Sequence, residues 1–213
     1  MPHNRMQRKD AARNRERLLA AASKLFTSRG LEVTLNDVAH HAGVGVGTAY
    51  RNFANKGEVI RALFADRLAE MIVRAEAAVL EEDAWTGLVG FLEDSLRAKR
   101  DDRALAELLT TPDVGRDLAD QARDRLGALV NTLVHRAQEQ GTVRADMAGT
   151  DTVFLEIALG AVMRCTNTVE PDLYRRLLAI FLDGMRTRDD NSLLSPTPLS
   201  LVTTHRIVSG HTR

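Results

Sequence analysis

The stretch TLNDVAHHAGVGVGTAYRNF, residues 34–53, predicts two short helices joined by a tight turn. Thr34 and Asp37 have the spacing of a capping box, in which each side chain accepts a hydrogen bond from the other residue's backbone N–H. Gly43 has the conformational freedom that a helix C-terminus needs, and residues 45–53 supply the second helix. The pattern predicts a helix-turn-helix, the motif that places its second helix in the major groove of DNA.

Several side chains around this motif can contact a duplex. The hydroxyl of Thr34 and the amides at that helix start can hold a phosphate, and Lys56 adds a cation at the start of the next helix. On the second helix, Arg51 can bind a guanine edge and Asn52 can reach an adenine, although either can contact a phosphate instead. Further polar candidates on the same helix are Thr48 and Tyr50.

The rest of the chain also has the composition and periodicity of helices. Aromatic residues make up 4% of the 213 positions, whereas long stretches are rich in Ala, Leu, Glu and Arg, which favours helix over strand. Helical repeats of apolar residues end at Gly30 and resume after Asn55. We expect an all-α protein in which a long helix joins an N-terminal three-helix head to a helical body. Further helices are predicted at residues 84–99, 103–111, 113–140, 153–163 and 173–185.

Two of the body helices carry more apolar surface than one core requires. Residues 153–163 are apolar almost all round apart from Glu156, and residues 173–185 have a broad apolar stripe. Such surface favours burial against a second subunit, although both helices could instead run through the centre of the body. For a homodimer, the candidate interface residues are Phe154, Ala158, Val162, Leu177, Phe181 and Met185.

The head resembles the TetR (tetracycline-repressor-like) family of bacterial regulators. The resemblance covers roughly residues 13–64 and rests on spacings, glycines and the run Tyr50-x-x-Phe53-x-x-Lys56 occurring together. It implies a homodimer with two helix-turn-helix heads and a helical ligand-binding body, usually a repressor released by a small molecule. It also implies phosphate contacts for Thr34 and Lys56 and a DNA-backbone contact for Tyr50. The groove-facing positions that it implies are Asn36, Val46, Gly47, Thr48 and Arg51.

The resemblance and the patterns together predict the organisation of the chain. We expect a mobile basic arm at residues 1–9, a DNA-binding domain at 10–56, an effector-binding and dimerisation domain at 57–188, and a flexible tail at 189–213. Residues 1–61 hold eleven Lys or Arg against five Asp or Glu, a formal charge of +6, which leaves −6 for the remainder. This division suits a phosphate-binding head on a non-binding body, although a solvated charged surface would have the same composition.

We therefore expect a cytoplasmic regulator that binds a palindromic double-stranded DNA operator, responds to a small molecule and needs no cofactor. An apolar effector with one hydrogen-bonding group suits the inward residues of the middle helices. These pocket candidates are Met71, Trp85, Leu88, Phe91, Leu92, His135 and Met163. Two alternatives stay open: a DNA-binding module without small-molecule control, and a helical enzyme, although the sequence has no local catalytic motif.

Other classes of site are disfavoured. No run of about 18 apolar residues predicts a membrane-spanning helix. His40 and His41 are neighbours that point about 100° apart on a helix, so they cannot share a metal from one face. The glycines at 43, 45 and 47 lack the preceding strand of a dinucleotide-binding loop. Cys165 has no partner for an intrachain disulfide and reads as a small buried apolar residue.

Overall fold

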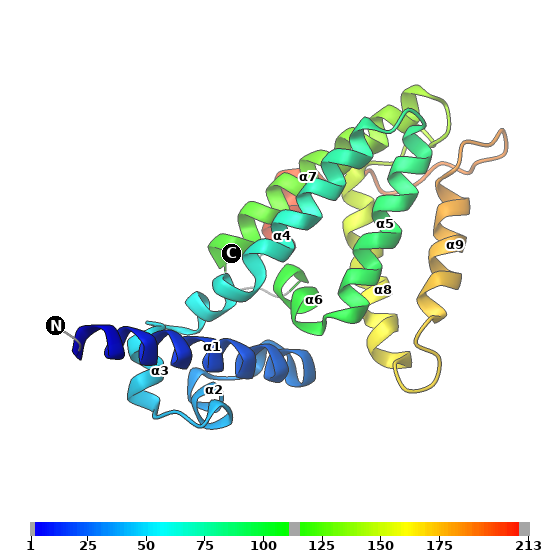
Figure 1. The fold of residues 1–213 in the computed structure, drawn as a ribbon. Helices are drawn as coiled ribbons and strands as arrows, with labels where there is room; N and C mark the ends of the chain where they lie inside the picture. The colour runs from blue at the N-terminus through cyan, green and yellow to red at the C-terminus, as the bar shows by residue number, and fades with distance from the viewer. Residues whose placement is uncertain (1–2, 111–115, 209–213) are drawn as a thin grey trace.

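The computed structural model describes residues 3–110 and 116–208, and within these ranges the chain is helical, with no β-structure beyond one isolated bridge between Val143 and Arg186 (Figure 1). The predicted all-α class is confirmed. The elements are α1 (His3–Arg29), η1 (Gly30–Glu32), α2 (Leu35–Ala42), α3 (Val46–Asn52), α4 (Lys56–Leu80), α5 (Ala84–Asp101), α6 (Arg103–Thr110), α7 (Arg116–Glu139), α8 (Gly149–Thr166), α9 (Leu173–Met185) and α10 (Leu201–Val208).

Helices α1 to α3 form the head, which lies below the body in Figure 1 and touches α4 and α6. Thr34 caps α2 with the complete capping box, and Gly43 ends α2 in the left-handed conformation at φ 63°. Helix α1 begins at His3, so residues 3–9 extend this helix instead of forming a separate arm. Arg, Met, Gln and Lys in that segment have good helix propensity, which outweighs the lack of an apolar period.

Helix α4 belongs to both the head and the body (Figure 1). Its first half buries Ile60 and Phe64, and the Phe64 ring stacks on Phe26 of α1 with ring centroids 6.4 Å apart. Its second half buries Met71 and Ala75 in the body, where α4 packs against α5 and α7. One continuous apolar stripe therefore connects the head core to the body core.

The body has a second apolar cluster away from α4. Helices α5, α8 and α9 supply it, and α8 packs against both α7 and α9. Its buried members are Leu96, Leu155, Leu159, Met163, Tyr174 and Leu178.

The expectation of a flexible tail at 189–213 is wrong for α10, which packs against α7. The Thr150 hydroxyl donates to the Leu199 carbonyl oxygen at 2.9 Å, which fixes the chain just before this helix. The Ser-, Thr- and Pro-rich composition suggested disorder, but contacts to distant parts of the chain order the segment. Residues 209–213 lie outside the described ranges.

Candidate nucleic-acid interface and internal cavity

The start of α2 is fixed by hydrogen bonds within the capping box. The Asp37 amide donates to Thr34 Oγ1 at 3.1 Å, and the Thr34 amide donates to Asp37 Oδ2 at 2.9 Å. The Thr34 hydroxyl also donates to this carboxylate, and these bonds hold the pKa of Asp37 below its usual range. Asn36 is exposed in the first turn of α2. Thr34 and Asn36 are thus presented to solvent on a rigid helix start.

Two arginines of α1 position the turn and α3. Arg17 donates from Nη2 to the Ala42 carbonyl oxygen at 2.8 Å, at the end of α2. Arg15 lies over the Phe53 ring, 4.3 Å from its centroid, and donates to the Asn52 carbonyl oxygen at 3.3 Å. Neither contact was predictable from the sequence, because both join residues at least 25 positions apart. They link α1 to the end of α2, beside the turn, and to the end of α3.

Helix α3 exposes most of the predicted DNA-facing side chains. Tyr50 is 50% exposed, Val46 is 37% exposed and Gly47 is open to solvent. Arg51 is exposed and donates from Nε to the Gly47 carbonyl oxygen at 3.1 Å. Asn52 is half-buried and donates from Nδ2 to the Thr48 carbonyl oxygen at 2.8 Å. Arg51 and Asn52 both donate to carbonyl oxygens of their own helix, but only Arg51 is exposed, as Tyr50 is.

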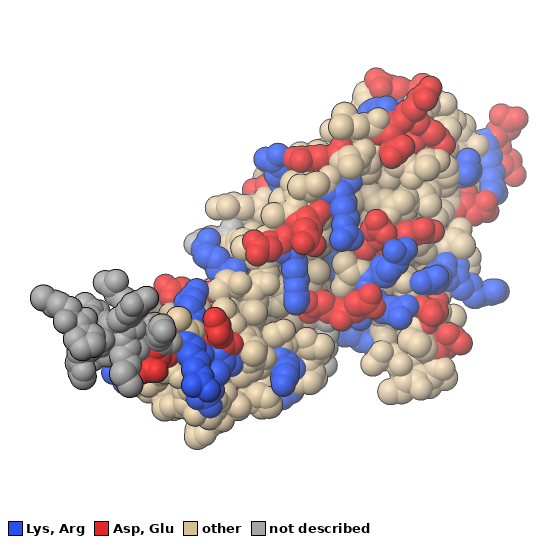
Figure 2. All heavy atoms as spheres, viewed as in Figure 1, with Lys and Arg blue, Asp and Glu red and all other residues tan. Residues whose placement is uncertain are grey.

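Lys56 makes a contact inside the head. Its Nζ donates to the Leu31 carbonyl oxygen at 2.7 Å and is half-buried at the start of α4. This bond ties α4 to the turn that follows α1. On the face shown in Figure 2, the Lys and Arg side chains of the head stand among acidic ones, so this face has no unbroken basic patch.

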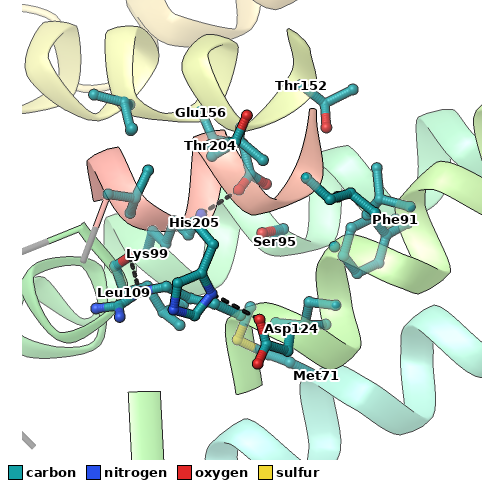
Figure 3. A pocket seen from close by; sticks show the side chains of 18 of the residues that line it. Met71, Phe91, Ser95, Lys99, Leu109, Asp124, Thr152, Glu156, Thr204 and His205 are labelled. Atoms are coloured by element: carbon teal, nitrogen blue, oxygen red, sulfur yellow. Dashed lines mark hydrogen bonds and ion pairs between the residues drawn. The ribbon is translucent and has the colours of Figure 1, made fainter. Parts of the chain in front are cut away.

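A cavity of about 390 Å³ lies inside the body. Helices α4 to α8 and α10 all contribute to its wall (Figure 3). Its lining is mainly apolar, with polar side chains from α5, α7, α8 and α10. The lining residues are Met71, Phe91, Ser95, Lys99, Leu109, Arg123, Asp124, Leu126, Gly127, Val130, Thr152, Val153, Glu156, Ile157, Leu201, Val202, Thr204, His205 and Val208.

Of the predicted pocket residues, Met71 and Phe91 line this cavity. The other five lie elsewhere, because a helix turned toward the interior faces other helices as well as the cavity. Leu88 and Leu92 are fully buried in the main core, the apolar cluster that runs from the head through α4 into the body. Met163 belongs to the second cluster, and the Trp85 ring lies under Arg186. His135 is exposed and lies 3.4 Å from Glu139.

The sequence contains a signal for the buried ion pair of the cavity wall. Glu156 interrupts an otherwise apolar run and forms an ion pair with Lys99, which is buried on α5. A charged residue within a buried apolar stripe needs a partner of opposite charge. Helix α10 was harder to predict, because its short amphipathic run LVTTHRIV follows a segment rich in Ser, Thr and Pro.

The predicted dimer residues divide into two groups. Phe154 and Phe181 are 36% and 44% exposed, and Ala158 is also exposed. Val162 and Leu177 are half-buried. Met185 is 5% exposed and belongs to the main core, so its assignment to an interface is wrong. Ile180, at 60% exposure, is a further apolar residue on α9.

A second contact between the body and the head comes from α6. Glu107 accepts a hydrogen bond from the Leu31 amide at 2.6 Å, beside Gly30. The left-handed backbone of Gly30, at φ 74°, leaves room for the Glu107 carboxylate, which would lie 2.3 Å from an added Cβ. Leu109 on the same helix lines the cavity. Helix α6 therefore contacts the head at one point and the cavity at another.

The part of the chain that the structure describes contains neither a metal site nor a membrane-spanning helix. There, no group of three or more His, Cys, Asp or Glu side chains is placed to hold a metal ion. No described helix is both long and apolar enough to span a membrane. Cys165 is exposed, which contradicts the expectation that it is buried.

Comparison with known proteins matches both parts of the chain. The profile of bacterial regulatory proteins of the tetR family matches residues 18–63, and that of the SbtR-like transcriptional regulator C-terminal domain matches residues 83–187. A TetR transcription regulatory protein from Mycobacterium vanbaalenii is 30% identical, with a TM-score of 0.50 over 85% of this chain and 99% of that one.

Two further similarities are more limited. Curated HTH-type transcriptional regulators from Staphylococcus aureus are 43% identical over 53 residues, which is 24% of this chain and 29% of theirs. The match therefore spans less than a third of the length of these relatives. The regulator FadR from Bacillus subtilis, in complex with stearoyl-CoA, is 16% identical and shares the fold with a TM-score of 0.60 over 80% of this chain and 98% of that one.

Proposed function

The chain belongs to the TetR family of transcriptional regulators, and we propose that it is a homodimeric repressor whose α3 helices bind a palindromic DNA operator. A small molecule in the body cavity releases it from the operator. Within each head, Tyr50 and Arg51 supply the accessible side chains of α3, and the start of α2 at Thr34 supplies phosphate contacts.

The observation that carries this proposal is the path of α4. This helix begins at Lys56, beside the helix-turn-helix, and reaches the cavity at Met71. A ligand that displaces Met71 can therefore tilt the helix that supports the head. Helix α6 provides a second route, because Leu109 lines the cavity and Glu107 binds the Leu31 amide of the head.

The geometry of a duplex explains why a small tilt suffices. Two recognition helices that read half-sites one turn apart need a separation near 34–36 Å. A rotation of each head about α4 changes that separation and places one half-site out of register. The ligand must bind the arrangement that does not fit DNA more tightly than the one that does, because equal affinity for both shifts nothing.

The dimer is proposed through α8 and α9. Phe154 and Phe181, with Ala158 and Ile180 nearby in sequence, expose apolar side chains on these two helices. Burial of such surface against the same surface of a second copy gives a closed two-fold assembly. Sedimentation at micromolar concentration should give a species of about twice 23.5 kDa, and replacing Phe181 with Asp should give the monomer.

The proposed function is tested by finding the operator first. DNA fragments from the source genome that the purified protein retains should share a palindromic site, and the protein should bind it more tightly than random duplex. Adding small molecules from a broad panel should then release the protein. Retention of random duplex as strongly as any fragment would favour a DNA-binding module without sequence specificity, and operator binding that no compound weakens would argue against release by a ligand.

A further inference from the structure

Each ionisable side chain of the cavity wall has a partner of ionisable type, within the wall or beside it. Lys99 forms an ion pair with Glu156, and His205 Nδ1 lies 2.7 Å from a carboxylate oxygen of Asp124. Arg123 pairs with Asp120 and also donates to two backbone carbonyl oxygens of α6. A charged ligand would need one of these groups to leave its partner, at the cost of burying an unpaired charge. This arrangement favours an uncharged ligand.

Two buried polar atoms of the wall have no hydrogen-bond partner among the described residues. One is Oε1 of Glu156, the carboxylate oxygen that does not bind Lys99, and the other is Oγ1 of Thr204 on α10. Figure 3 shows both side chains at the same part of the cavity, where α8 and α10 meet. A buried polar atom without a partner costs free energy that a bound group can recover.

The two atoms differ in what they can bind. A carboxylate oxygen can only accept, whereas a threonine hydroxyl can both donate and accept. A hydroxyl group on the ligand satisfies both, because it can donate to Glu156 and accept from Thr204. Apolar side chains such as Phe91, Val130 and Ile157 surround the rest of the cavity.

We infer that the cavity binds an uncharged, largely apolar molecule with a hydroxyl group, which Glu156 and Thr204 recognise. The inference rests on the proposed function, since it names the class of molecule that would release the operator. Helix α10 lies beyond both matched regions, which cover residues 18–63 and 83–187. Thr204 therefore gives this chain a specificity determinant outside the matched regions.

Calorimetry on the full chain with four matched probes tests the inference. The probes are 4-butylphenol, butylbenzene, 4-butylbenzoate and 4-butylbenzylammonium, which share an apolar body and differ in the polar group. At pH 7 the phenol is uncharged, and it should bind at least tenfold more tightly than each of the others. Equal affinity for the phenol and butylbenzene, tightest binding of either charged probe, or binding of none would overturn the inference.

Variants identify the residues that recognise the hydroxyl. Thr204→Val keeps the shape of the side chain and should weaken phenol binding about fivefold without changing butylbenzene binding. The double variant Lys99→Leu/Glu156→Leu removes the acceptor without leaving a lone charge and should abolish the preference for the phenol. Thr132→Val, at an exposed position of α7 outside the cavity, is the matched control and should bind like the parent protein.

The operator assay separates the two claims. If one of the charged probes or butylbenzene releases the operator while the phenol does not, the proposed function stands and the hydroxyl inference fails. If the protein binds no specific DNA, the proposed function fails, while the calorimetric order of the four probes still decides the inference. An unchanged phenol affinity in both Thr204→Val and the double variant would also overturn it.

Discussion

The head and the cavity place their polar side chains in opposite ways. On α3, Tyr50 and Arg51 are exposed, and their neighbours are backbone atoms of the same short helix or solvent. In the cavity wall, Lys99 is buried and its partner Glu156 comes from another helix. The exposed residues of α3 can therefore be replaced without unfolding the chain, whereas a buried charge of the cavity wall can be replaced safely only together with its partner.

The largest effect on stability is expected when one member of the buried ion pair is removed. Lys99→Met leaves the Glu156 carboxylate without its ion-pair partner and should lower the free energy of unfolding by about 3 kcal/mol. Lys99→Met/Glu156→Leu should recover most of this loss, because a well-packed apolar pair replaces the ions. Urea unfolding at one fixed protein concentration measures both. Equal stability of Lys99→Met and the parent would mean that the pair is solvated.

The contact between head and body is probed at Gly30. Gly30→Ala places a Cβ at a positive φ and against the Glu107 carboxylate, which cannot move without losing the Leu31 amide. We expect a loss of about 2 kcal/mol in stability. Gly90→Ala on α5, where an added Cβ meets nothing, is the control and should be neutral or slightly stabilising. Similar melting temperatures for the two variants would contradict the proposed tight contact.

Replacing the exposed residues of α3 should change DNA binding alone. Arg51→Ala should weaken operator binding about tenfold with little loss on random duplex if it reads a base. Tyr50→Ala should weaken binding to both kinds of duplex. Fluorescence anisotropy against each DNA measures these losses, with Arg74→Ala on the exposed side of α4 as the control. Equal loss on both duplexes for Arg51→Ala would assign it to the DNA backbone.

Lys56 tests whether one residue of the head can both stabilise the fold and contact DNA. Lys56→Met removes the hydrogen bond to the Leu31 carbonyl oxygen and should cost about 1 kcal/mol of stability. If the ammonium also contacts a phosphate, the slope of log affinity against log salt should fall by about one. A changed melting temperature with an unchanged salt slope would restrict Lys56 to its structural contact.

The smallest effect is expected at Asp146, in the body. Hydrogen bonds from Arg144 and from the Leu194 amide hold the pKa of Asp146 far below its usual range. Because the folded-state pKa is lowered, the stabilisation is complete above the ordinary Asp pKa of about 4 and is lost as the pH falls further. The difference in melting temperature between the parent and Asp146→Asn should therefore shrink between pH 6 and pH 3. A melting-temperature difference that stays constant over this pH range would mean that Asp146 does not contribute to the loss of stability in acid.

The head was predictable from sequence because its determinants are local. Thr34 and Asp37 are three residues apart, and Gly43 lies at the end of the same helix, so the motif could be read from one short stretch. The cavity was only partly predictable, since Lys99 and Glu156 are 57 positions apart and Glu107 and Leu31 are 76 apart. Periodicity identifies which face of a helix is buried, as for Met71 and Phe91, but not which neighbour covers it.

The exposed segment between α9 and α10 has a consequence for proteolysis. Residues 186–200 are exposed except for the half-buried Asn191, and they contain no helix. A protease that cuts such a segment would leave α10 held on the body by side-chain and hydrogen-bond contacts alone. After a single cleavage, α10 would no longer be covalently attached to the rest of the chain and could dissociate from the cavity wall. The polypeptide from α1 to α9 would remain intact.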